Sequence, residues 1–335
     1  MKNQPKISIL IPCYNVEKYI RQCMDSVVNQ TLKDIEIIAI NDGSKDNTLS
    51  ILKDYAKNDK RIIIIDKANS GYGDSMNHGL KEATGEYIGI VESDDFVELN
   101  MFETLYNTAI KNNAEVVKSN YYEYTTKTNT NKKAFIVPKQ DLNQVILPRE
   151  KQGIFWSAPC IWSAIYKRDF LTQNNIEFLP TPGASYQDTS FNFKVWLMAE
   201  RVFFISEAFL HYRIDNENSS VNNPGKVFCV CDEYHEIERF AKESPYYDEV
   251  KYLIPIIKFG CYNWNFARLA YPLNYQFLKT FSSEYKQIFK QKLLTKRTAG
   301  KKTYRQAKRI SKYPNLYFIY YCLKKIKKSL LRKSS

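Results

Sequence analysis

Apolar residues follow two alternating patterns along the first 110 positions of the chain. Short runs that are almost continuously apolar are typical of strands covered on both faces, and apolar residues recurring every three or four positions are typical of amphipathic helices. The runs predict strands over 6–12, 34–40, 62–65 and 86–91. The segments between and after them predict helices over 17–30, 46–58 and 74–84, and from about 97 onward. This alternation predicts a parallel α/β sheet with right-handed crossovers.

The alternation ends after residue 113. The later elements are predicted as a strand over 115–124, a polar loop over 125–133, a helix from Arg168, a helix over 190–199 capped by 185–190, and strands over 202–205 and 209–213. Beyond Pro224 the apolar spacing is helical. We therefore expect one domain over 1–222 and a helical extension over 223–335.

The net charge of +13 is concentrated near the end of the chain. Residues 285–335 contain 17 Lys and Arg and no Asp or Glu, so the rest of the chain carries a net charge of −4. A basic segment suits an anionic membrane surface or a nucleic acid, but no nucleic-acid recognition motif accompanies it, so nucleic acid is not an expected partner. Since apolar and aromatic residues are interleaved with the cations, above all at 316–321, we expect peripheral membrane contact through this tail. A solvated basic helix packed on the domain is the alternative.

Three features of the sequence concern the compartment of the protein. No run approaches the roughly 18–20 apolar residues of a membrane span. Residues 1–5 lead into the first strand without the apolar core of a signal peptide. The seven cysteines form no C-x-x-C pair, which favours reduced thiols. We expect a cytoplasmic protein at the inner face of the cell membrane.

Polar turns follow three of the predicted strands. They contain Tyr14, residues 42–44 and the acidic run Glu92-Ser93-Asp94-Asp95. Because the carboxyl ends of parallel strands share the edge at which α/β sheets bind ligands, we expect these turns to converge. Adjacent carboxylates repel each other unless a cation lies between them, so the acidic run indicates a metal site or, alternatively, a solvated turn.

Four segments of the first half, in their order and spacing, resemble the inverting glycosyltransferases of family 2. They are 9–15 (Ile-Leu-Ile-Pro-Cys-Tyr-Asn), 26–31 (Ser-Val-Val-Asn-Gln-Thr), 40–48 (Ile-Asn-Asp-Gly-Ser-Lys-Asp-Asn-Thr) and 85–95, where Gly-Glu-Tyr precedes the acidic run. The resemblance implies the GT-A nucleotide-diphospho-sugar transferase fold, with a mostly parallel central sheet and helices on both faces. It also implies a nucleotide-sugar-binding half over 1–113 and an acceptor half over 114–222.

The resemblance implies donor contacts at the first two turns. Tyr14 would stack on the nucleotide base beside Pro12, with an exposed turn tyrosine as the alternative. Asp42 would accept a hydrogen bond from the base, with a turn-forming Asp-Gly pair as the alternative. Glu17 would reach the nucleotide, or would serve as a favourable carboxylate in the first turn of its own helix.

The acidic run resembles the metal-binding D-x-D motif of the family. The resemblance implies that Asp94 ligates Mg²⁺ or Mn²⁺, which take oxygen ligands and neutralise a departing diphosphate. Glu92 occupies the first acidic position but is one methylene longer than the usual Asp, so we expect it to contact the ribose. Ser93 and Asp95 complete the nucleotide-sugar-binding run.

Two later segments resemble further parts of the family site. Tyr186-Gln187-Asp188 resembles the motif that carries the general base, so Asp188 is the predicted base for the acceptor hydroxyl. A plain helix N-cap is the alternative. His211-Tyr212-Arg213, followed by Asn218-Ser219-Ser220, resembles an element near the diphosphate. This implies that His211 completes the metal shell and that Arg213 contacts phosphate, with a structural histidine as the alternative.

The predicted function is metal-dependent transfer of a sugar, with inversion, from a nucleotide-diphosphate sugar to a carbohydrate or lipid-linked acceptor. A UDP-sugar is the favoured donor. Cell-surface polysaccharide synthesis is the expectation for the family. Residues 71–79 depart from it, because they lack its usual Ala-Arg-Asn. Two other classes stay open. A sugar-phosphate nucleotidyltransferase would carry a Gly-rich phosphate loop where residues 12–15 stand, and a non-catalytic GT-A-like scaffold would have lost Asp94 or Asp188.

Overall fold

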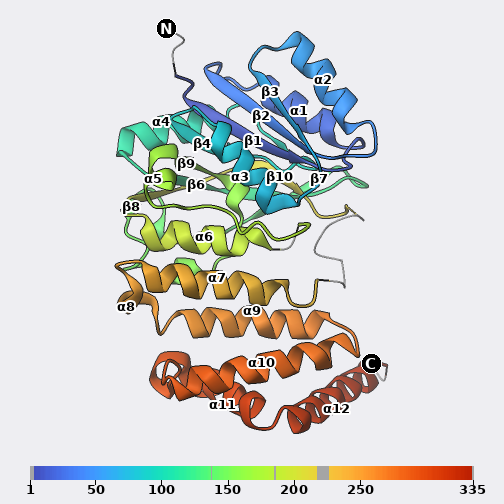
Figure 1. Cartoon of the computed structure of the whole chain (residues 1–335), viewed down its shortest axis with the longest axis vertical. Coiled ribbons are helices and arrows are strands. Elements are labelled where there is room, and N and C mark those ends of the chain that lie inside the picture. Colours follow the sequence, from blue (N-terminus) through green and yellow to red (C-terminus); the bar gives the residue numbers. More distant parts are fainter. Residues whose placement is uncertain (1–3, 137, 185, 217–225, 334–335) are drawn as a thin grey trace. The chain divides into compact units, whose positions relative to one another are not determined.

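The computed structural model describes residues 4–136, 138–184, 186–216 and 226–333, with side chains up to residue 327. The chain divides into two compact units, Met1–Asn222 and Asn223–Ser335. Figure 1 shows a sheet with flanking helices in the first and a stack of helices in the second.

The described residues of the first unit form one ten-stranded sheet, in the order β3-β2-β1-β4-β9-β6-β10-β5, with β7 on β6 and β8 on β10. The strands are β1 (Ile7–Cys13), β2 (Ile35–Asp42), β3 (Ile62–Lys67), β4 (Tyr87–Ile90), β5 (Phe96–Val97), β6 (Val116–Thr125), β7 (Thr130–Ala134), β8 (Val145–Ile146), β9 (Ala164–Lys167) and β10 (Val202–Arg213). The helices are α1 (Ile20–Val28), α2 (Thr48–Asn58), α3 (Tyr72–Glu82), α4 (Met101–Asn112), α5 (Arg168–Gln173) and α6 (Gln187–Met198), with 3-10 turns η1 (Lys139–Asp141), η2 (Gln152–Trp156) and η3 (Ile161–Ser163).

The predicted parallel sheet is confirmed in β3-β2-β1-β4, which pair in parallel throughout. Every residue of β1 and β2 is buried, which explains why both runs are almost continuously apolar. On the other side of β4, strand β9 pairs antiparallel with β4 and also with β6. Strand β10 then pairs with β6 in parallel. The sheet as a whole is therefore mixed.

Helices cover both faces of the parallel strands. A side chain at Gly79 of α3 would meet Leu10 at 3.2 Å, so α3 packs closely on the face to which Leu10 points. Leu10 is paired with Ile90, and Gly89, one residue earlier on β4, faces the other way. A Cβ at Gly89 would meet the Phe102 ring of α4 at 2.5 Å. Helices α3 and α4 therefore lie on opposite faces of the sheet.

Several boundaries differ from the predicted ones. The first strand continues through Pro12, because pairing with β4 ends at Leu10 and a proline two residues later removes no hydrogen bond from that ladder. The first helix begins at Ile20 and not at residue 17, and Asp42 is the last residue of β2 and not part of a turn.

Later elements also differ. The strands predicted over 202–205 and 209–213 are one strand, β10, whose pairing with β6 shifts register between Phe204 and Leu210. The predicted loop over 125–133 contains most of β7. The short strand β5, which follows the acidic run and pairs with β10, was not predicted.

The described elements of the second unit are helical, as predicted. They are α7 (Cys229–Glu243), α8 (Tyr247–Val250), α9 (Ile254–Arg268), α10 (Leu273–Lys290), α11 (Lys296–Lys312) and α12 (Pro314–Lys333). The core is aromatic: Tyr262 packs edge-on against Phe277 and Phe281, each with ring centroids 5.3 Å apart. In the described part of the chain, none of the helices has both the length and the apolar content that crossing a membrane requires.

Candidate active site

The turns that follow β1 and β2 are joined by hydrogen bonds. Asn15, in the left-handed region with φ 53°, donates its backbone N–H to Ser44 Oγ (3.0 Å) and accepts from the Lys45 backbone at Oδ1 (2.8 Å). Glu17 Oε2 accepts from the backbone N–H and the side-chain amide of Asn47, the residue before α2. Glu17 therefore lies before its own helix and holds the start of α2. Tyr14, between these contacts and the buried strand, is 47% exposed.

Asp42 is buried and surrounded by donors. Its Oδ1 accepts from Lys67 Nζ (2.5 Å) and the Ser70 backbone (2.9 Å), and its Oδ2 accepts from the Gly71 backbone (2.9 Å) and Asn69 Nδ2 (3.2 Å). Two carboxylate oxygens offer about four acceptor positions, so this set uses all of them. Asp42 thus fixes the chain at 69–71.

The segment from Ser70 to Gly73, whose last two residues begin α3, connects three parts of this edge of the sheet. Gly71 is held by Asp42, and the Tyr72 hydroxyl donates to Glu92 Oε1 at 2.7 Å. The Tyr72 backbone N–H donates to the Gly183 carbonyl (3.1 Å), which also accepts from Gln187 Nε2 (2.9 Å), one residue before Asp188. We call residues 70–73 the linking loop.

Glycine is required at position 73 of the linking loop. A Cβ there would stand 2.1 Å from the Leu179 carbonyl oxygen, a distance that no side chain can accommodate. The backbone of α3 can therefore approach the segment that leads into α6.

Strand β10 holds the acidic run from the other side. Arg213 donates its Nε–H to the Asp94 carbonyl (2.8 Å) and its backbone N–H to Asp95 Oδ1 (2.8 Å). Asn216 Nδ2 donates to Asp94 Oδ2 (2.7 Å). The Arg213 guanidinium is buried and lies 4.9 Å from the Tyr19 ring centroid, so in this structure it positions the acidic run.

Asp188 lies close enough to Glu92 for its charge to raise the pKa of Glu92. Burial raises the pKa of Glu92 to about 8, the hydrogen bond from Tyr72 opposes this, and the charges of Asp94 and Asp188 add to the rise. Burial raises the pKa of Asp188 to about 7 despite hydrogen bonds from Thr189. Asp188 stands in the first turn of α6, whose N-cap is Tyr186 (φ 69°), so the alternative of Asp188 as the N-cap does not hold.

The acidic run also reaches the end of β1. Burial raises the pKa of the Cys13 thiol, the charge of Glu92 raises it further, and a hydrogen bond with Ser93 lowers it. Cys23 donates its S–H to the Glu92 carbonyl at 3.6 Å. With the Asn15–Ser44 contact, these interactions bring the three predicted turns together on one edge.

His211 is enclosed within the protein. Its Nδ1 lies 2.7 Å from Asn131 Oδ1, its Nε2 lies 3.0 Å from Glu98 Oε1, and its ring stacks on Phe96 with centroids 4.3 Å apart. Burial lowers its pKa, and Glu98 opposes this. Neither ring nitrogen is open to a metal ion here, so His211 is a structural histidine in this arrangement. The segment Asn218-Ser219-Ser220, named with it, lies outside the described residues.

A divalent cation at the acidic run would need substrate oxygens to complete its coordination. Among the described residues, no group of three or more His, Cys, Asp or Glu side chains is arranged to hold a metal. Mg²⁺ is often held by only one or two carboxylates, together with waters and substrate phosphates. Asp94 is partly exposed, with Glu92 two residues away, while Asp95 is buried and its Oδ2 has no hydrogen-bond partner in the described chain. Burial and the charge of Asp94 raise the pKa of Asp95, although the Arg213 backbone N–H lowers it, so a cation nearby would relieve an unfavourable arrangement.

Two residues of this edge were not singled out from the sequence. Lys67 ends β3 and binds Asp42, so the strand-end argument applied to the third strand would have found it. Tyr72 begins α3 between Gly71 and Gly73. That pair of glycines, which often marks a tight turn or a close backbone approach, was the signal that could have found it.

Comparisons with known proteins agree with this architecture. A family model described as Glycosyl transferase family 2 matches residues 8–172. The uncharacterized glycosyltransferase EpsJ of Bacillus subtilis is 35% identical over 251 residues, 72% of this chain and 70% of EpsJ. Glycosyltransferase GlyA of Streptococcus pneumoniae is 30% identical over 221 residues, 62% of this chain and 30% of GlyA.

Solved structures identify the fold. The crystal structure of S. aureus TarS 1–349 in complex with UDP-GlcNAc matches with a TM-score of 0.68 at 19% identity, covering 90% of each chain. The likeness confirms the predicted GT-A fold followed by helices. Together with the EpsJ match and the family model, it identifies the chain as an enzyme that belongs to glycosyltransferase family 2.

Proposed function

We propose that this glycosyltransferase moves a sugar from a nucleotide-diphosphate sugar, first of all a UDP-sugar, to a hydroxyl of a carbohydrate or lipid-linked acceptor, with inversion. The observation that carries the proposal is the linking loop, which is bonded to Asp42, to Glu92 and to the segment leading into Asp188. The first two turns, the acidic run and Asp188 are thus linked at one edge of the sheet. TarS, which has this fold, was crystallised with UDP-GlcNAc, and this supports a UDP-sugar as the donor.

The nucleotide base of the donor is assigned to Tyr14, after β1. The half-exposed ring of Tyr14 offers a face on which a base can stack. The acceptor positions of Asp42 are already filled, so we assign it the positioning of Lys67 and Gly71 rather than direct contact with the base. Glu17 has the same kind of role at the start of α2.

The diphosphate is assigned to the acidic run. Asp94 would hold Mg²⁺ or Mn²⁺, and Glu92, two residues before it, would contact the ribose. A bound divalent cation supplies the positive charge that stabilises a departing diphosphate. Arg213 and Asn216 keep the Asp94 backbone and carboxylate in place.

Asp188 is assigned the proton transfer. Its carboxylate takes the proton of the acceptor hydroxyl while that oxygen bonds to the anomeric carbon and the bond from this carbon to the nucleotide diphosphate breaks. Attack from the face opposite the leaving group inverts the centre. A pKa of about 7 places the base near neutral pH, where general bases work best.

The pH dependence of transfer follows from Asp188. The base acts only when ionised, so kcat/KM should fall about tenfold for each pH unit below the pKa of about 7. Initial rates measured from about pH 5 to 9, with substrate well below KM, test this. A profile that stays level through the acid range would contradict the assignment, and thermal unfolding at each pH controls for loss of fold.

Thermal unfolding with candidate donors tests the proposed function. UDP-GlcNAc, UDP-glucose, UDP-galactose and GDP-mannose would each be added with and without Mn²⁺. A donor at about a hundred times its Kd should stabilise the protein by about 2.7 kcal/mol, a rise in Tm of several degrees. We expect the rise with at least one UDP-sugar and expect Mn²⁺ to enlarge it. If none of the nucleotide sugars shifts Tm at millimolar concentration, the proposal is wrong.

A further inference from the structure

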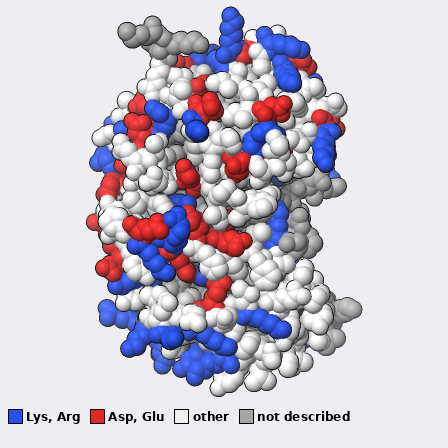
Figure 2. Space-filling view, in the orientation of Figure 1, with Lys and Arg blue, Asp and Glu red and all other residues white. Residues whose placement is uncertain are grey.

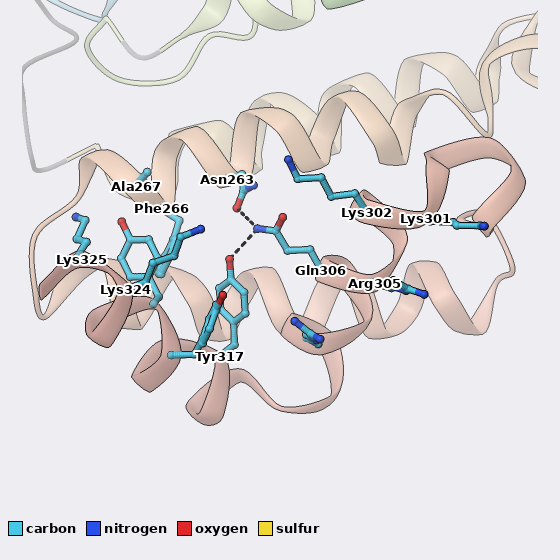
Figure 3. A pocket seen from close by; sticks show the side chains of 13 residues that line it. Asn263, Phe266, Ala267, Lys301, Lys302, Arg305, Gln306, Tyr317, Lys324 and Lys325 are labelled. Carbon is cyan, nitrogen blue, oxygen red and sulfur yellow. Dashed lines mark hydrogen bonds between the residues drawn. The ribbon is translucent and has the colours of Figure 1, made fainter. Parts of the chain in front are cut away.

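The second unit contains a basic cavity of about 710 Å³ between α9, α11 and α12. Six cationic side chains line it, and Figure 3 shows those that it labels on α11 and α12. They are Lys301, Lys302, Arg305 and Arg309 of α11 and Lys324 and Lys325 of α12. None of the described residues that line the cavity is acidic. In Figure 2, Lys and Arg side chains gather over the last helices, in the lower part of the view.

The cavity has an ordered, aromatic interior. Gln306 donates through Nε2 to Asn263 Oδ1 (3.2 Å) and to the Tyr317 hydroxyl (2.8 Å), as the dashed lines in Figure 3 mark. This one side chain joins α9, α11 and α12. Phe266 of α9 packs against Tyr321 of α12 with ring centroids 4.6 Å apart. The cations thus line a cavity whose helices are joined by these hydrogen bonds and ring contacts.

Helix stability does not explain the position of two of the cations, Lys301 and Lys302. Helix α11 is interrupted at Gly300 (φ 73°), so Lys301 and Lys302 stand at the start of a new helical segment that runs to Lys312. Cations are unfavourable at a helix N-terminus, where the backbone N–H groups and the dipole favour anions. The two lysines and the segment start therefore favour the same ligand charge. The favoured charge is negative.

An exposed apolar stripe lies beside the cavity. Five residues of α12 at helical spacing are each more than half exposed: Leu316, Ile319, Tyr320, Leu323 and Ile326. The other side of α12 packs inward, where Phe318 meets Tyr275 with ring centroids 5.0 Å apart. Tyr320 also lines the cavity, so cavity and stripe are continuous. An apolar face flanked by cations is typical of helices that lie in a membrane interface.

We propose that this cavity binds the phosphate headgroups of an anionic phospholipid surface, and that the apolar stripe of α12 enters the acyl boundary beside it. The cations that line the cavity attract a negatively charged ligand. The exposed apolar residues of α12 favour a ligand that also has an apolar part, as a phospholipid does. A free phosphate or a nucleic acid satisfies only the first condition. The proposal does not depend on the identity of the donor or acceptor.

Vesicle binding by the full chain tests the proposal. The test variant is Lys301→Gln/Lys302→Gln/Arg305→Gln, and the matched control is Lys286→Gln/Lys290→Gln/Lys312→Gln, which removes equal charge at exposed positions outside the cavity lining. Co-sedimentation would use vesicles of phosphatidylcholine alone and with phosphatidylglycerol. The native chain should bind only the mixed vesicles, and less as salt is raised. The test variant should lose on the order of 100-fold in partitioning, and the control less than about tenfold.

Two further measurements separate a lipid surface from other anions. Leu316→Ser/Leu323→Ser should weaken vesicle binding although it removes no charge, and circular dichroism would check that each variant is folded. Glycerol 3-phosphate should not displace the protein from vesicles. Equal loss in the charge control, unchanged binding of the serine variant, displacement by glycerol 3-phosphate, or tighter binding of a single-stranded oligonucleotide than of mixed vesicles would each overturn the proposal.

Discussion

Replacing Asp188 by Asn should leave donor binding intact and reduce sugar transfer by about 10²–10⁴-fold, the usual contribution of a general base. Asn has nearly the same shape but cannot take a proton from the acceptor hydroxyl. The measurement is single-turnover transfer with saturating donor, with donor affinity determined in parallel by calorimetry. Retention of transfer within a few-fold of the native rate would remove Asp188 from the mechanism.

Two controls separate catalysis from folding in that experiment. Asp169→Asn changes an exposed carboxylate in the first turn of α5 and should leave transfer unchanged. Burial raises the pKa of Asp188 from 3.8 to about 7. Between these pH values the folded protein keeps a proton on Asp188 that the unfolded chain loses. The free energy of unfolding therefore falls as the pH rises through this range. Asn removes the disfavoured charge. The Asp188→Asn variant should therefore unfold at no lower a temperature than the native protein at pH 8.

Replacing Asp94 by Asn should abolish the part of donor binding that depends on the divalent cation. The amide keeps the size of the side chain and leaves an oxygen for Asn216, but it removes the charge that attracts the ion. Calorimetric titration with UDP should show Mn²⁺-dependent affinity in the native protein. In the variant, the gain in UDP affinity that Mn²⁺ produces should be smaller by on the order of 100-fold.

The matched control is Asp54→Asn, an exposed carboxylate on α2. It should bind UDP as the native protein does. If the Asp94 variant keeps its full response to Mn²⁺, the ion is held elsewhere or is not used. Because Asp188 is left in place, this result is independent of the general-base experiment.

The elements that the sequence predicted well are those buried on both faces. β1 and β2 are apolar at nearly every position because helices cover both sides of the sheet, and such runs stand out without any knowledge of partners. β5 consists of two residues and is a strand only because β10 lies beside it. A two-residue strand has no period of its own, so a sequence pattern cannot reveal it.

In the candidate site too, some residues could be predicted from the local sequence and others only from contacts between distant parts of the chain. The acidic run was predicted from its residue types, and Asp188 from the resemblance of residues 186–188 to a family motif. Their neighbours depend on contacts across the chain. Arg213 binds the Asp94 carbonyl from 119 positions away, a positioning role that no local motif encodes. His211 matched the expected order, but its partner Asn131 lies on β7, in a segment read as a loop. Its structural role therefore required the fold.

The linking loop has a consequence for attempts to change the donor by directed evolution. Residues 70–73 are the obvious segment to randomise, because they depart from the family pattern and border the site. Yet the same few residues hold Asp42, Glu92 and the approach to Asp188, so most members of such a library would lose activity before their preference could be scored. Tyr14, which is exposed at the end of β1, is the position from which selection can begin.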